Sequence, residues 1–126
     1  MELLHLSASE RPEESHVWSL LGREYVLKED YNKALEILFE TLNKKDIEYS
    51  NGRRVLVYTL YLIALCYFNL GNYEECRWYC EEFIRVNPTY REPYFLMARA
   101  MNEQKLYTLA EATVESGLKY GAYKRD

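Results

Sequence analysis

Three cysteines and two histidines are the residues of this sequence that could bind a metal or act as nucleophiles. Cys76 and Cys80 lie four positions apart, so on a helix both thiols would share one face and could supply two thiolate ligands to zinc. A structural zinc site requires four ligands, and Cys66, His5 and His16 lie in other segments. The alternative is that Cys76 and Cys80 are small residues that pack one helix against another. We expect the packing role, no metal and no cofactor.

The sequence also lacks the common catalytic motifs. It contains no Gly-rich phosphate loop, no G-x-S-x-G and no Asp-x-Asp pair, and its cysteines have no neighbouring histidine of the kind that activates a thiol. The charge balance is 20 Asp and Glu against 16 Lys and Arg, whereas nucleic-acid binding is typical of basic domains. We therefore expect a chain that is not an enzyme and does not bind nucleic acid.

The longest apolar run, residues 55–68, is interrupted only by Thr59. A membrane-spanning helix needs about 20 apolar residues, so this run predicts a buried core helix and no membrane insertion. Residues 1–14 have neither the basic start nor the apolar core of a secretory signal. Three cysteines cannot all pair, and reduced thiols are typical of the cytosol. We expect a cytoplasmic location.

The helices that must position these residues recur along the chain. Tyr31, Tyr73 and Tyr107 are 42 and then 34 residues apart, and each follows a polar turn. A period of 34 residues is typical of paired helices in a repeat array. The first interval carries eight extra residues, which fall in the polar stretch 43–52. Two further sets keep the same offsets: Tyr25, Tyr67 and Met101, and Ala34, Cys76 and Ala110.

The repeated residues resemble a known signature. Trp18, Leu21, Gly22 and Tyr25 are spaced as in the W-x2-L-G-x2-Y half of the tetratricopeptide repeat. Gly71-Asn72-Tyr73 and Pro88 resemble the turn and terminal proline of a second such repeat. The resemblance implies an all-α fold, an α-α superhelix built as a right-handed solenoid of antiparallel helix pairs.

The offsets and the resemblance together divide the chain into repeats. We expect a repeat domain over residues 13–126, with repeats at about residues 15–49, 57–90 and 91–124. Residues 1–12 are expected to be the end of a preceding repeat helix, because Pro12 lies where that repeat's closing proline would be. The chain would then be part of a longer array.

The resemblance implies a protein-protein interaction scaffold that binds a partner segment in a concave groove lined by the first helix of each repeat. The partner would be a protein or peptide segment, or another domain of the parent chain. Aromatic residues flanked by Arg23 and Arg99 would supply binding energy, because aromatic and arginine side chains are enriched at interface hot spots. The expected groove residues are His16, Ser19, Arg23, Tyr58, Tyr61, Leu65, Phe68, Asn69, Phe95, Arg99 and Asn102.

Two alternatives stay open from the sequence. The segment Asn87–Glu111 and the opening LGREYVLKEDYNKAL look like the repeats attached behind the catalytic domain of bacterial family 2 glycosyltransferases, which implies an accessory region of a larger enzyme. Alternatively, the open ends of the solenoid could stack on further repeats or on a second copy, because residues 121–126 contain no polar capping helix.

Overall fold

The structure is a computed structural model that describes residues 14–44, 47 and 50–121. The described residues form six helices and no strand. The expected end of a preceding repeat helix, residues 1–12, lies outside the described residues. The helices are α2 (Ser15–Leu27), α3 (Tyr31–Leu42), α4 (Ser50–Asn69), α5 (Tyr73–Val86), α6 (Glu92–Glu103) and α7 (Tyr107–Tyr120).

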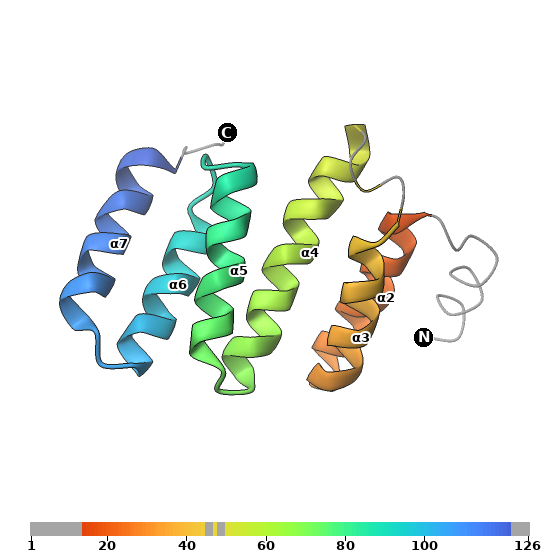
Figure 1. Cartoon of the computed structure of the whole chain (residues 1–126), viewed down its shortest axis with the longest axis horizontal. Coiled ribbons are helices and arrows are strands. Elements are labelled where there is room, and N and C mark those ends of the chain that lie inside the picture. The colour runs from red at the N-terminus through yellow and green to blue at the C-terminus, as the bar shows by residue number, and fades with distance from the viewer. Residues whose placement is uncertain (1–13, 45–46, 48–49, 122–126) are drawn as a thin grey trace.

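The helices form three pairs that follow one another along the long axis of the molecule (Figure 1). The pairs are α2 with α3, α4 with α5, and α6 with α7. Helix α4 contacts α2 and α3 of the pair before it and α6 of the pair after it, so consecutive pairs share one core. The all-helical repeat fold expected from the sequence is confirmed.

The turn that joins the two helices of each pair contains one residue in the left-handed backbone region. These residues are Glu29, Gly71 and Lys105, with φ of 63°, 81° and 65°, and they keep the 42- and 34-residue offsets. The next residue of each turn donates its backbone N–H to a carbonyl five positions earlier, which satisfies the end of the first helix. These bonds join Asp30 to Tyr25 at 2.9 Å, Asn72 to Tyr67 at 2.8 Å and Leu106 to Met101 at 2.8 Å.

The signature residue Gly22 allows α2 and α3 to approach closely. A Cβ atom placed on Gly22 would lie 2.5 Å from Leu38 Cδ2 and 2.8 Å from Leu38 Cγ. Leu38 is fully buried, so it has little room to move away from such an atom. A residue with a Cβ would fit here only if the Leu38 side chain or its helix shifted.

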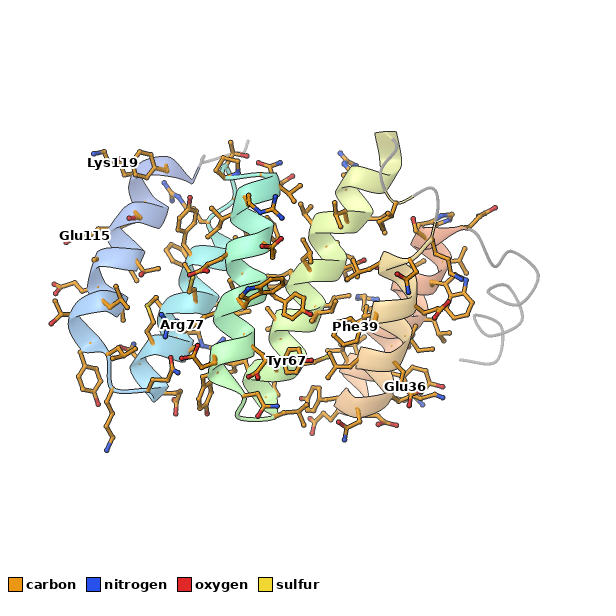
Figure 2. The ribbon with its side chains drawn as sticks, viewed as in Figure 1. Glu36, Phe39, Tyr67, Arg77, Glu115 and Lys119 are labelled. Carbon is orange, nitrogen blue, oxygen red and sulfur yellow. The ribbon has the colours of Figure 1, made fainter. Side chains whose placement is uncertain are left out.

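The apolar run at residues 55–68 lies within α4, the central helix of the core. Ile63, Ala64 and Cys66 are fully buried there. On the neighbouring helix, Tyr79 stacks on Tyr67 with ring centroids 5.7 Å apart, and its ring also lies 6.0 Å from that of Phe39. Figure 2 shows Phe39 and Tyr67 on the adjacent helices α3 and α4. Within the described ranges, no helix is long and apolar enough to cross a bilayer.

Candidate functional site

The first helices of the three pairs carry residues at equivalent positions of the repeat, which we call residues of one repeat phase. Ser19, Tyr61 and Phe95 share one phase, because they keep the 42- and 34-residue offsets. The phase does not guarantee equal exposure. Ser19 is only 3% exposed, and its hydroxyl oxygen accepts a hydrogen bond of 3.3 Å from Thr59 Oγ1 on α4. Ser19 therefore joins α2 to α4 and is not available to a partner, contrary to the expectation for this position.

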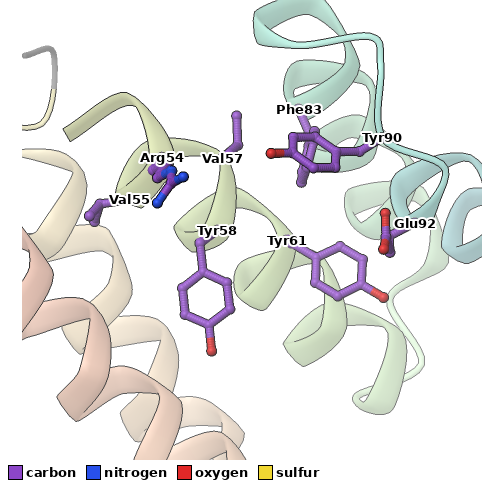
Figure 3. Close-up of a pocket in the computed structure, with 8 residues that line it drawn as sticks. All are labelled: Arg54, Val55, Val57, Tyr58, Tyr61, Phe83, Tyr90 and Glu92. Atoms are coloured by element: carbon purple, nitrogen blue, oxygen red, sulfur yellow. The ribbon is translucent and has the colours of Figure 1, made fainter. Parts of the chain in front are cut away.

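An open hollow of about 540 Å³ lies where the N-terminal half of α4 meets the end of α5 and the start of α6. We call it the aromatic hollow. Figure 3 shows Tyr58 and Tyr61 projecting from α4, with Tyr90 and Glu92 lying across from them. Its lining residues are Arg54, Val55, Val57, Tyr58, Tyr61, Phe83, Tyr90 and Glu92.

The rings around the hollow are held by edge-to-face contacts. Tyr61 and Phe83 have centroids 6.3 Å apart at an interplanar angle of 81°, and Phe83 meets Tyr90 at 5.7 Å and 82°. Phe83 is buried, while Tyr58 and Tyr90 are exposed. Such pairs contribute about 0.5–1.5 kcal/mol beyond the area that they bury. The rings of Tyr61, Phe83 and Tyr90 therefore form one connected set of edge-to-face contacts at the hollow.

The charges at the hollow are opposite in sign. Arg54 and Glu92 are both exposed. Burial raises the pKa of the Tyr61 phenol above its usual value, Cys80 and Glu92 add to the rise, and Arg99 counteracts it. The Tyr61 hydroxyl therefore stays protonated at neutral pH and keeps a hydrogen that it can donate.

Two other expected groove residues, Phe68 and Arg99, lie together. The Arg99 guanidinium carbon lies 4.6 Å from the centroid of the Phe68 ring, and the same ring meets Tyr73 edge to face at 5.5 Å. Arg23 does not join this group, because its Nη1 lies 3.8 Å from Glu24 on its own helix. Arginine and aromatic residues are thus combined between α4, α5 and α6.

The remaining expected residues occupy several environments. Asn69 donates Nδ2 to the Leu65 carbonyl at 2.8 Å, which ties it to its own helix. The ring of Phe95 is directed toward α7, since its Cε1 lies 3.3 Å from where a Cβ on Gly117 would be. The exposed members of the expected groove are His16, Arg23, Tyr58, Asn69, Phe95, Arg99 and Asn102, and the half-buried ones are Tyr61, Leu65 and Phe68.

Sequence reasoning missed most residues of the aromatic hollow. Glu92 could have been found, because it has the repeat phase of His16 and Tyr58. Phe83 lies at the end of α5 and Tyr90 in the turn that follows. The expectation that only first helices line the groove did not include these segments. The missed residues are Arg54, Val55, Val57, Phe83, Tyr90 and Glu92.

The three cysteines are buried with free thiols. Cys76 and Cys80 pack with Ala64, Leu96 and Ala100 in the core shared by α4, α5 and α6. The hydrogen bond that the Cys80 thiol donates to Cys76, together with the burial of the site, raises the pKa of Cys80 above its usual value. Within the described part of the chain, no three metal-ligating side chains come together. The cysteines pack one helix against another. The cytoplasmic location that was expected from reduced thiols stays a prediction.

Comparison with known proteins identifies the repeat. Residues 57–90, from α4 through α5 to Tyr90, match the family model described as the tetratricopeptide repeat. No curated protein is a significant match to this sequence. The match covers one helix pair, and its bounds enclose the turn at Gly71.

Solved structures of MamA have the same fold. The chain is similar to MamA MSR-1 with a TM-score of 0.75 and 17% identity, over 94% of this chain and 64% of that chain. For MamA AMB-1 the TM-score is 0.73 and the identity 18%, over 94% of this chain and 65% of that chain. This chain therefore spans slightly less than two thirds of the length of these structures. None of these matches favours the glycosyltransferase resemblance. Residues 57–90 are thus a tetratricopeptide repeat, and the described helix pairs share the helical-repeat fold of the MamA structures.

Proposed function

We propose that this domain binds a protein segment by taking apolar side chains of that segment into the aromatic hollow. The observation that carries the proposal is the set of tyrosine rings, the exposed Tyr58 and Tyr90 and the half-buried Tyr61, around an open volume of about 540 Å³. Ligand-binding pockets of proteins measure about 300–1,000 Å³ and are lined mainly by apolar and aromatic side chains. Tyrosine is enriched at the energetic centres of interfaces.

The charges at the rim of the hollow would orient the bound partner segment. An acidic residue beside Arg54 and a basic residue beside Glu92 would both meet an opposite charge. Exposed pairs of this kind add little affinity, but they set orientation and association rate. The proposed partner is therefore a peptide segment with an apolar anchor between an acidic and a basic side.

Phe68 and Arg99 extend the same surface toward the other end of α4. Arg99 is exposed although it stacks on Phe68, so its guanidinium N–H groups can still bind a carboxylate or carbonyl of the partner. Of the residues expected from the sequence, Tyr58, Tyr61, Phe68 and Arg99 are those that this proposal uses.

Selection from a displayed library of random peptides tests the proposal without a known partner. Peptides selected on the unaltered domain should carry an apolar anchor and lose binding when Tyr58→Ala is introduced. Loss of one hot-spot side chain costs about 2 kcal/mol or more, which is a drop in affinity of more than tenfold. Arg54→Glu should favour peptides with a basic residue in place of the acidic one.

Tyr107→Ala is the matched control, because Tyr107 is an exposed tyrosine of α7, remote from the hollow in the chain. It should leave the affinity of the selected peptides unchanged. Chemical-shift mapping of the bound peptides locates the contact directly. Shifts restricted to α3 and α7, or equal losses for Tyr58→Ala and Tyr107→Ala, would overturn the proposal.

A further inference from the structure

The outer side of α7 carries large apolar side chains that no described helix covers. Tyr107 is 62% and Leu118 is 53% exposed. Their equivalents 34 positions earlier, Tyr73 and Ile84 of α5, pack against the core that α5 shares with α6. In Figure 2, Glu115 points away from the neighbouring helices on this outer side of α7. The outer face of α7 thus has the same apolar positions as the face of α5 that packs against α6.

At the other end of the described helices, α2 exposes a leucine whose repeat equivalents are buried. Leu20 of α2 is 41% exposed, whereas its repeat equivalents Leu62 and Leu96 are 4% and 2% exposed. Leu62 packs with Leu35 and Leu38 of α3, and Leu96 packs with the cysteines of α5. In α4 and α6, this leucine is buried by the second helix of the preceding pair.

We propose that the outer face of α7 in one copy of this chain packs on α2 of a second copy, in the same way that α5 packs on α6. Tyr107, Glu111 and Leu118 would then take the places of Tyr73, Arg77 and Ile84. Leu20 of the second copy would take the place of Leu96. In this arrangement the exposed face of α7 and the exposed Leu20 side of α2 cover one another.

Charge complementarity favours a second copy as the occupant. Within the chain, Arg77 Nη1 of α5 donates to Gln104 Oε1 at the end of α6, at 3.0 Å. The residue equivalent to Arg77 on α7 is Glu111, and the residue equivalent to Gln104 at the end of α2 is Lys28. Both are exposed, so the contact between copies places an acid opposite a base. A symmetric contact between two α7 helices would instead bring two Glu111 carboxylates together.

One residue opposes the contact and limits its strength. Glu24 occupies the position of Cys66 and Ala100, which are fully buried in the chain's own interfaces. Its carboxylate would lose water in the contact between copies, which disfavours the charged form. The contact is also head to tail, so it leaves free ends and produces open chains of copies that lengthen with concentration.

Sedimentation velocity over a series of protein concentrations tests this proposal on the full chain. The mean mass should rise with concentration beyond that of a dimer. Glu111→Lys and Lys28→Glu should each lower the association constant about tenfold, because attraction becomes repulsion at a partly covered pair. An equimolar mixture of the two variants should restore association, since each altered end then meets an opposite charge.

Further variants distinguish this contact from non-specific association. Glu24→Ala should raise the association constant several-fold, whereas Leu118→Glu should abolish association. Far-UV circular dichroism verifies that each variant is folded, as expected for exposed positions. Tyr58→Ala, which tests the aromatic hollow, should associate like the unaltered chain, so the two proposals fail independently. A chain that stays monomeric at every concentration, or charge reversals that change nothing, would overturn the proposal.

Discussion

The guanidinium of Arg99 lies over the ring of Phe68, 4.6 Å from its centroid, and joins α6 to α4. Arg23 has the same repeat phase as Arg99, but it pairs at 3.8 Å with Glu24 of its own helix. One repeated position therefore has a structural contact in α6 and only a surface ion pair in α2.

Arg99→Ala should lower the free energy of unfolding by about 0.5–1 kcal/mol, the usual contribution of an exposed cation–π contact. Urea denaturation measures the change. Arg23→Ala is the control, and it should stay within about 0.5 kcal/mol of the unaltered chain because exposed ion pairs contribute little. Equal effects at both positions would show that the stacking on Phe68 does not stabilise the fold.

Glu29→Gly and Lys105→Gly should each stabilise the domain. Both residues have φ near +64°, as does the turn glycine Gly71 at 81°, and this region costs a residue with a Cβ roughly 1 kcal/mol. The greater freedom of glycine in the unfolded chain offsets part of the gain, so we expect about 0.5 kcal/mol per site. Thermal unfolding measures the effect. Glu81→Gly in the exposed middle of α5 is the control and should destabilise by up to about 1 kcal/mol.

Gly22→Ala should destabilise the domain although alanine is the better helix former. The added Cβ would lie 2.5 Å from Leu38 Cδ2, and overpacking of this kind costs about 1–3 kcal/mol. Ala112→Gly at an exposed position of α7 isolates the helix preference, which is about 1 kcal/mol in favour of alanine. Denaturant midpoints of the two variants are the measurement. A more stable Gly22→Ala protein would mean that α2 and α3 can separate without cost.

The stability of the domain should fall as the pH rises above 9. Burial raises the pKa of the Cys66 thiol to about 12 from an ordinary value of 9.0. A raised pKa means that the folded state holds the proton more tightly, so this contribution to stability is fully present below pH 9. It is lost as the pH rises from 9 toward 12. Burial also raises the pKa of the Tyr67 and Tyr79 phenols, which adds a loss of the same sign above about pH 10.

Urea denaturation at pH 7, 9 and 10, on both sides of the ordinary thiol pKa of 9.0, measures the first part of this loss. Cys66→Ala removes the titrating thiol and should flatten the decline between pH 9 and 10, while its stability at pH 7 falls because a small cavity forms. The same decline in Cys66→Ala and in the unaltered chain would assign the effect to Cys80 and the tyrosines.

Much of the fold is determined by the sequence itself, because its signals are local. The backbone bonds that end the first helices at Tyr25, Tyr67 and Met101 recur at the offsets read from the sequence. Helix periodicity and turn chemistry act over a few residues, so they can be recognised without any tertiary contact. The repeat phase also placed Tyr58, Tyr61, Phe68 and Arg99 on first helices.

The tertiary structure decided which of these positions are open. Ser19 has the phase of Tyr61, yet it is buried because α4 approaches α2 and Thr59 bonds to it. The aromatic hollow depends on Phe83 and Tyr90, which come from α5 and the turn after it. Exposure and proximity depend on how helices distant in sequence pack, and that packing is set by the shapes of all the core side chains together. For this reason the repeat could be read from the sequence, whereas its proposed binding surface required the structure.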